Sequence, residues 1–188
     1  MPDQMVRDED IQVFHAEGIT FKVIIVGDAE VGKTSIVHSH IKKKFDSSYH
    51  TTVGVNIAKE SFTWGDLKVS LLIWDIAGQV QFYMLHKAYF NGASGIFYVF
   101  DLTRPNTLAT IKQNWYKACV DYGVANVPSL LIGNKSDLKA KVIKPAALNM
   151  AKTLGGLPYF ETSAKTGHNV EEVFQKLVEM LLTANKLV

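Results

Sequence analysis

The sequence predicts an α/β fold, in which a six-stranded, mostly parallel sheet with one antiparallel hairpin strand carries helices on both faces. Two observations support this prediction. Short aliphatic runs alternate along the chain with segments whose apolar residues follow helical spacing. Two adjacent strands are joined by Gly65-Asp66, which is typical of a short hairpin turn.

The first half of the chain begins with a buried strand over residues 21–26 and a helix over about 32–41. The hairpin strands follow over residues 55–64 and 67–74. A stretch from Gly78 to Phe82 is predicted to be a mobile loop. The continuous apolar run over residues 96–100 then has the character of a central parallel strand.

The second half of the chain continues the alternation. A helix passes through Leu108, Ile111, Trp115, Cys119 and Tyr122, a strand covers 129–132, a helix runs from Pro145 to about Leu154, and a short strand begins at Tyr159. The last helix has Asn169 as its predicted N-cap, and Glu172 three residues later completes a capping-box pattern. Its apolar face comprises Val170, Val173, Phe174, Leu177, Val178, Leu181 and Leu182.

Length and composition indicate one globular domain over residues 19–188, preceded by an extension, residues 1–18, that is partly disordered or forms a short extra element. The net charge of +2 gives no reason to expect nucleic acid as a partner. The one cysteine, Cys119, excludes an intrachain disulfide and is predicted to be buried. No signal peptide, membrane span or lipid attachment site is visible, so we expect a cytoplasmic protein, with peripheral association to a membrane through a partner as an option. Five of the six histidines show no metal-ligand spacing and are assigned no role: His38, His40, His50, His86 and His168.

The first strand leads directly into the sequence GDAEVGKT, residues 27–34, called here the glycine loop. Between a strand and a helix, the pattern G-x-x-x-x-G-K-[ST] is typical of a phosphate-binding loop. Its glycines let several backbone N–H groups point into one concavity at a helix N-terminus, where an anion is stabilised. Lys33 adds a positive charge, and the Thr34 hydroxyl can ligate magnesium. A plain glycine turn is the alternative for the loop taken alone.

Other strand ends carry complementary side chains, as expected if ligands bind at the carboxyl edge of a parallel sheet. Asp75 follows one hairpin strand and can reach a magnesium ion, and Gly78 can offer its backbone N–H to a terminal phosphate. Two later strands are followed by the polar segments 134–137 and 163–165.

Five motifs, GDAEVGKT, TTVG, WDIAGQ, NKSD and TSAK, occur in this order. Together they resemble a small GTPase of the Ras superfamily, over about residues 20–185, and are most similar to the Rab branch. The resemblance implies a P-loop NTPase fold and a GTP-binding molecular switch that slowly hydrolyses GTP to GDP and phosphate. Loops at about 45–54 and 76–90 would report the nucleotide state. The implied partners of this monomer are effector, exchange-factor and GTPase-activating proteins, in trafficking or signalling.

The resemblance also implies roles for individual residues. Gln79 would orient the attacking water and act with Lys33 in catalysis, while Mg²⁺ would be held by Thr34, Thr52 and Asp75. Contacts with the nucleotide would come from Asp28, Ala29, Glu30, Val31, Gly32, Lys33, Thr34, Ser35, Phe45, Tyr49, Thr52, Gly78, Asn134, Lys135, Asp137, Ser163, Ala164 and Lys165.

Recognition of guanine would rest on the last two motifs. Asp137 would accept from two guanine N–H donors, and an adenine base would leave this carboxylate unpaired. Asn134 would bond the guanine edge, and Ala164 would donate its backbone N–H to the guanine carbonyl. Lys135 would pack along the base and brace the glycine loop. A polar turn is the alternative reading of the NKSD segment.

Some residues depart from the family pattern. The only arginines, Arg7 and Arg104, lie neither in residues 45–52 nor next to Gln79, so acceleration by a partner's arginine is expected. Ala29 and Val80 replace family residues that bear on activation and exchange. They keep open a second hypothesis, a GTP-loaded binding scaffold with negligible hydrolysis. A P-loop kinase or ATPase is disfavoured by Asp137.

Overall fold

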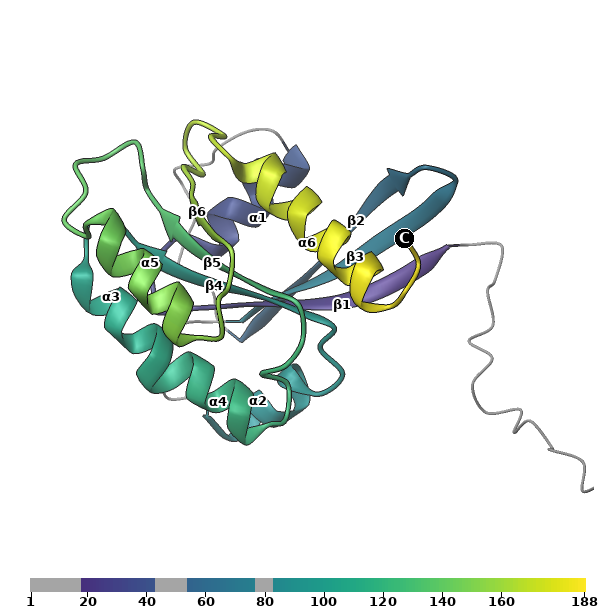
Figure 1. Cartoon of the computed structure of the whole chain (residues 1–188), viewed down its shortest axis with the longest axis horizontal. Coiled ribbons are helices and arrows are strands. Elements are labelled where there is room, and N and C mark those ends of the chain that lie inside the picture. The colour runs from purple at the N-terminus through teal and green to yellow at the C-terminus, as the bar shows by residue number, and fades with distance from the viewer. Residues whose placement is uncertain (1–17, 43–53, 77–82) are drawn as a thin grey trace, which may run out of the picture.

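A computed structural model of the chain describes residues 18–42, 54–76 and 83–188 (Figure 1). The expected extension, residues 1–18, lies almost wholly outside these ranges. The strands are β1 (Ile19–Val26), β2 (Val55–Trp64), β3 (Leu67–Ile76), β4 (Gly95–Asp101), β5 (Ser129–Asn134) and β6 (Tyr159–Glu161). The helices are α1 (Lys33–Lys42), α2 (Tyr83–Phe90), α3 (Pro105–Thr110), the π-helical segment η2 (Ile111–Tyr116), α4 (Lys117–Asp121), α5 (Lys144–Thr153) and α6 (Val170–Ala184).

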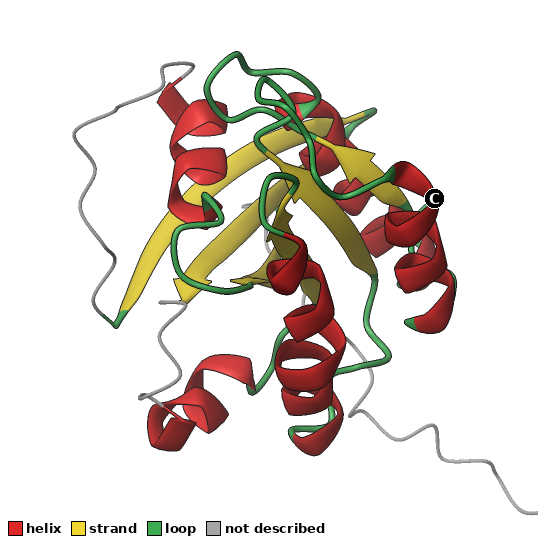
Figure 2. Ribbon diagram, turned by 90° about the vertical axis from the view of Figure 1, so that its left-hand side faces the viewer, coloured by secondary structure: helices red, strands yellow, loops and turns green. Residues whose placement is uncertain are grey.

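The strands form one six-stranded sheet in the order β2-β3-β1-β4-β5-β6. Only the β2–β3 pair is antiparallel, and the other pairs are parallel. The predicted fold class is therefore confirmed. Figure 2 shows the twisted sheet with helices on both sides. Because β1, β3, β4, β5 and β6 run parallel to one another, their carboxyl ends meet at one edge of the sheet.

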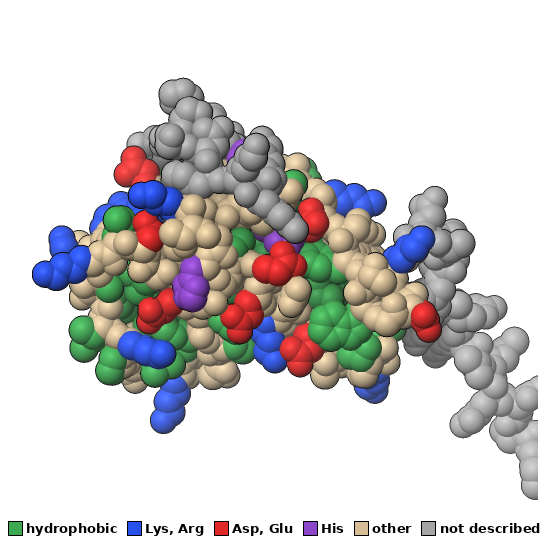
Figure 3. Space-filling view, turned by 90° about the horizontal axis from the view of Figure 1, so that it is seen from above, with side chains coloured by type: hydrophobic (Ala, Val, Ile, Leu, Met, Phe, Trp, Pro, Cys, Tyr) green, Lys and Arg blue, Asp and Glu red, His purple; other side chains and the backbone are tan. Residues whose placement is uncertain are grey.

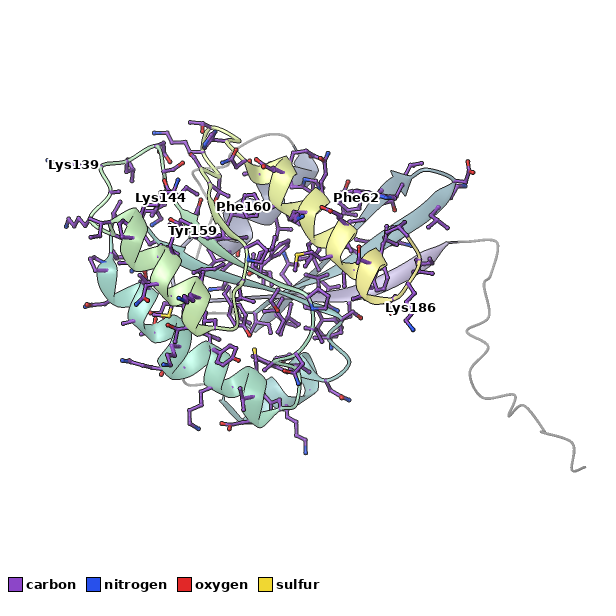
Figure 4. All side chains as sticks on the ribbon, in the orientation of Figure 1. Phe62, Lys139, Lys144, Tyr159, Phe160 and Lys186 are labelled. Atoms are coloured by element: carbon purple, nitrogen blue, oxygen red, sulfur yellow. The ribbon has the colours of Figure 1, made fainter. Side chains whose placement is uncertain are left out.

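Two hydrophobic cores lie on opposite faces of the sheet, because successive strand residues alternate between the faces. Val23 of β1 packs into the core beneath α1 and α6, and the next residue, Ile24, packs into the core beneath α2, α3, α4 and α5. Two consecutive residues of β6, labelled in Figure 4, also face opposite cores: Phe160 packs into the first core, beneath α1 and α6, and Tyr159 into the second. Cys119 is fully buried in the second core, as predicted.

A histidine forms part of the first core. His40 of α1 stacks on Phe174 of α6, with ring centroids 4.0 Å apart, and lies 5.6 Å from the ring of Phe62 on β2. Its Nδ1 lies 3.1 Å from a carboxylate oxygen of Glu171. The sequence assigned no role to this side chain, and the structure shows that it joins three elements by packing.

Helix α2 is the main element that sequence reasoning did not predict. Its sequence, YMLHKAYF, is apolar almost throughout and contains no acidic residue in its first turn. An eight-residue segment without an amphipathic period or a recognisable cap gives no local signal for a helix. The predicted helix through Trp115 is present, but η2 interrupts it with a π-helical stretch that spacing alone does not reveal.

The start of α6 corrects the predicted capping box. Asn169 is the N-cap, but its backbone is left-handed, with φ of 54°, and its side chain makes no capping hydrogen bond. Instead, Asn169 Nδ2 donates to the backbone oxygen of Glu161 at 2.9 Å, which ties the start of α6 to the end of β6. The first turn of α6 still carries Glu171 and Glu172, whose negative charges interact favourably with the positive end of the helix dipole.

Within the described ranges, no helix is long and apolar enough to cross a lipid bilayer. The face of the molecule seen in Figure 3 carries acidic and basic side chains interspersed with one another.

We expect Asn169→Ala to lower the free energy of unfolding by about 1–2 kcal/mol, because alanine loses the bond to Glu161 and tolerates the left-handed backbone poorly. Asn169→Gly should cost less, since glycine adopts this conformation without strain. Equilibrium urea unfolding would measure both, with the exposed Asn149→Ala of α5 as the control. Equal losses for the alanine and glycine variants would contradict the role of backbone strain.

Candidate functional site

The carboxyl edge of the sheet brings together the segments that carried the predicted motifs. The glycine loop leaves β1, and Asp75 lies near the end of β3, paired in register with Ile25. The end of β4, Asp101, pairs with Asn134 at the end of β5, and the segment after β6 follows beside them. Residues distant in the sequence therefore converge at this edge, as expected for an open parallel sheet.

The glycine loop approaches the rest of the site so closely that two of its positions have no room for a side chain. A Cβ atom at Gly27 would lie 2.1 Å from the backbone oxygen of Val99, and one at Gly32 would lie 2.2 Å from Asn134 Nδ2. Both glycines also have positive φ. Glu30, between them, holds a left-handed φ of 64°, which is unfavourable for a residue with a Cβ.

Lys33 lies inside the curve of this loop. Its side chain is buried, and Nζ donates to the backbone oxygens of Gly27 at 2.8 Å and Asp28 at 2.9 Å. Burial lowers the pKa of Lys33 to about 8, although the negative charges of Asp75 and Asp28 oppose this shift. A buried ammonium held by neutral carbonyls is poised to pair with an anion.

The side chains of Thr34 and Asp75 form a second feature of the loop. The Thr34 hydroxyl donates to Asp75 Oδ2, while Oδ1 is buried and has no hydrogen-bond partner among the described residues. Burial raises the pKa of Asp75, and the Thr34 hydrogen bond and the charge of Lys33 act in the opposite direction. A hydroxyl beside an unpaired carboxylate oxygen supplies the hard oxygen donors that Mg²⁺ prefers.

The described residues contain no group of three or more His, Cys, Asp or Glu side chains that could hold a metal ion by themselves. A magnesium ion at Thr34 and Asp75 would therefore need further ligands, such as phosphate oxygens and water. Magnesium commonly binds in this way.

Asn134 joins the end of β5 to the glycine loop. Its side chain is almost completely buried, and Nδ2 donates to the backbone oxygen of Val31 at 2.9 Å. Its Oδ1 accepts from the Thr162 hydroxyl and from the backbone N–H of Ala164, both at 3.2 Å. The direct brace of the loop, expected from Lys135, thus comes from Asn134.

Asp137 and Ser163 lie side by side at the outer part of the edge. Ser163 Oγ donates to Asp137 Oδ1 at 2.6 Å, which fixes the orientation of this exposed carboxylate. Lys165 is exposed nearby in sequence, whereas Ala164 is buried. Lys135 Nζ pairs with Asp101 Oδ2 at 2.7 Å. The NKSD and TSAK motifs are therefore joined by two side-chain hydrogen bonds, one between Asp137 and Ser163 and one between Asn134 and Thr162.

Sequence reasoning missed a set of contacts between the glycine loop and the stretch formed by Arg104, α3 and η2. The Asp28 carboxylate accepts from Thr110 Oγ1 at 2.7 Å and from Trp115 Nε1 at 2.8 Å. Arg104 Nη2 donates to the backbone oxygen of Ala29 at 2.9 Å. The only available signal was an acidic residue, Asp28, inside a loop expected to bind anions.

Five predicted site residues lie outside the described parts of the chain, namely Phe45, Tyr49, Thr52, Gly78 and Gln79. Their predicted roles stay predictions. Of the remainder, Asp28 to Ser35 form the loop and the first turn of α1, Asp75 and Asn134 lie at the ends of β3 and β5, and the others follow β5 and β6 at the same edge. The described arrangement offers backbone donors, a buried cation, oxygen ligands and an oriented carboxylate.

Comparison with known proteins identifies the family. A model of the Ras family matches residues 22–183 of this chain. Ras-related protein SEC4 of Saccharomyces cerevisiae is 37% identical over 171 residues, which cover 89% of this chain and 79% of that protein. Ras-related protein Rab-13 of Canis lupus familiaris and Ras-related protein Rab-2B of Dictyostelium discoideum are each 37% identical, over 86% of this chain and 80% of their own length. The chain therefore belongs to the Ras family of small GTPases and, within it, to the Rab branch.

Proposed function

We propose that this chain is a GTP-hydrolysing molecular switch, whose GTPase domain spans residues 19–188 and which regulates membrane trafficking. The observation that carries the proposal is the convergence, at one sheet edge, of Lys33, the Thr34–Asp75 pair and the Asp137–Ser163 pair. Lys33 and the Thr34–Asp75 pair are suited to bind phosphates with magnesium. The Asp137–Ser163 pair is suited to bind a base that has hydrogen-bond donors. Membership of the Rab branch supports the assignment to trafficking.

The nucleotide base would bind against Asp137. The Asp137 carboxylate, held by Ser163, would accept hydrogen bonds from two N–H donors of guanine. Lys135 and Lys165 would lie beside the base. Asn134, whose amide is already bonded to the loop and to Thr162, would mainly hold this pocket together. Adenine would leave the carboxylate without donors, and unpaired polar groups are costly when desolvated.

The phosphates would lie in the glycine loop, against Lys33 and the backbone donors of Glu30, Val31 and Gly32. Magnesium, which Ras-family GTPases generally use with bound nucleotide, would supply charge neutralisation and orientation of the terminal phosphates. Thr34 and Asp75 would hold it, because the unpaired Oδ1 of Asp75 needs a partner. The proposed contacts with the nucleotide also include Asp28, Ala29 and Ser35, and Ala164 beside the guanine base.

The switch itself would involve residues outside the described ranges. We assign Thr52 and Gly78 to sensing the terminal phosphate, Phe45 and Tyr49 to covering the nucleotide, and Gln79 to orienting the attacking water. Effectors, exchange factors and GTPase-activating proteins would read or change the state of the loops at about 45–54 and 76–90.

We expect the nucleotide released from denatured, purified protein to be GDP or GTP, and Asp137→Ala to weaken guanine nucleotide binding by roughly 100-fold or more, because two base donors lose their acceptor. Competition binding with a fluorescent guanine nucleotide measures the loss. Asp66→Ala removes an exposed carboxylate from the hairpin turn and serves as the control. Equal affinity of the protein for ATP and GTP would overturn the proposed function.

Gln79→Leu should retain GTP but hydrolyse it at least about tenfold more slowly, because leucine cannot orient water. Single-turnover phosphate release is the measurement, and Gln175→Leu on the exposed surface of α6 is the matched control. If wild-type protein released no phosphate at all, the alternative of a GTP-loaded scaffold would replace the switch.

Binding of GDP should take up close to one proton per nucleotide at pH 9 and much less at pH 7. In the protein without nucleotide the pKa of Lys33 is about 8, so this side chain is mostly neutral at pH 9. An anionic phosphate beside Lys33 raises its pKa, and the side chain therefore takes up a proton when GDP binds. At pH 7 the ammonium is already charged before binding. Calorimetry in buffers of different ionisation enthalpy counts the protons, and equal uptake at the two pH values would contradict this account.

A further inference from the structure

The outer side of the glycine loop is held by side chains that belong to no nucleotide-binding motif. Arg104 caps the start of α3, Thr110 ends α3, and Trp115 lies in η2; we call these three side chains the α3 anchor. All three contact Asp28 or Ala29, the second and third residues of the loop.

The Asp28 carboxylate needs these contacts because of its location. A free carboxylate in a loop that binds phosphate would repel the ligand. Here both oxygens are occupied, Oδ2 by the Thr110 hydroxyl at 2.7 Å and Oδ1 by the indole N–H of Trp115 at 2.8 Å. Because Trp115 is itself buried, its N–H is fixed in space. The charge of Asp28 is thus directed toward α3, where it attaches the loop.

The contact with Ala29 determines the direction of a backbone donor. In a trans peptide the C=O and the following N–H point in opposite directions. Arg104 binds the backbone oxygen of Ala29, so the N–H of Glu30 is turned to the side away from Arg104. This peptide precedes the left-handed Glu30, whose strained backbone needs external support to persist.

Arg104 is held in place by a buried acid. Its Nε donates to Asp101 Oδ2 at 3.0 Å, and Asp101 also accepts from Lys135 and Thr103. Burial raises the pKa of Asp101, but the hydrogen bonds from Lys135 and Thr103 and the charge of Lys135 outweigh burial and hold the pKa below its usual value. The guanidinium therefore links a charged acid on β4 to a loop carbonyl, using two nitrogens at once.

We propose that the α3 anchor positions the glycine loop for nucleotide binding and thereby slows nucleotide release, through Arg104 on Ala29 and through Thr110 and Trp115 on Asp28. The inference rests on the proposed function, because it concerns the lifetime of the nucleotide at that site. These side chains contact Asp28 and Ala29 of the loop, so they are positioning residues that act through the loop.

The expected effects follow from the chemistry of each contact. Hydrogen bonds to charged groups contribute enough to change an equilibrium constant about tenfold. Arg104→Gln should therefore release GDP about tenfold faster than wild type. Arg104→Lys should do the same, because one ammonium cannot reach both Asp101 and Ala29. Trp115→Phe and Thr110→Val should each accelerate release several-fold by removing one donor from Asp28.

The test is the dissociation rate of a fluorescent GDP analogue from the full chain with magnesium, measured by displacement with excess GDP. Lys112→Gln and Trp64→Phe are matched controls, since they remove an exposed cation of η2 and a tryptophan of the hairpin without touching the loop. The free energy of unfolding of each variant is measured in parallel by urea unfolding.

A double-mutant cycle separates positioning from simple packing. If Trp115 acts through Asp28, Trp115→Phe accelerates release in the wild-type background but not in the Asp28→Ala background. Equal acceleration in both backgrounds, or wild-type release from Arg104→Gln, would overturn the proposal, as would full rescue by Arg104→Lys. A wild-type protein that binds no guanine nucleotide would instead overturn the proposed function, so the two failures are distinguishable.

Discussion

The buried amide of Asn134 is the interaction on which the rest of the site depends. It donates to Val31 in the glycine loop and accepts from Thr162 and Ala164 after β6. Three chain segments that follow different strands are thereby fixed by one side chain. Because an unsatisfied buried amide is costly, Asn134 favours the conformation in which all three bonds are made, and the proposed phosphate and base subsites share one support. The absence of a side chain at Gly32 allows this close approach.

Loop carbonyls held by fixed donors explain how a short segment can present its N–H groups inward. Lys33 occupies the oxygens of Gly27 and Asp28, Arg104 that of Ala29, and Asn134 that of Val31. Each bond fixes a peptide plane before any ligand arrives. Donors arranged in advance do not need to reorganise on binding, which is why such loops stabilise anions better than mobile chain would.

The mostly parallel sheet, the hairpin and the glycine loop could be predicted because their signals are local: apolar runs, a turn dipeptide and a motif between a strand and a helix. The order of the strands in the sheet was not predicted, because it depends on contacts between distant segments. Helix α2 could not, since its nearly uniform apolar sequence has no period. The capping box failed for another reason. Asn169 has the right chemistry for an N-cap, but a carbonyl on β6 competes for its side chain, and only the fold brings that carbonyl near.

The same distinction applies within the site. Lys33 and Thr34 stand in a motif, whereas Arg104 and Trp115 are recognised only when the fold places them against the loop. The sequence indicates only that Arg104 lies outside residues 45–52 and away from Gln79, and no motif predicts its position near the loop. Its partner Asp101 ends β4, next to β1 in the sheet, so the guanidinium reaches the loop from the neighbouring strand. Arg104, which lies outside every motif and just after the strand next to β1, therefore holds the backbone oxygen of Ala29 in the glycine loop. Because α3 begins directly after this arginine and ends at Thr110, and η2 contributes Trp115, a displacement of this helical stretch would reach the glycine loop through all three contacts.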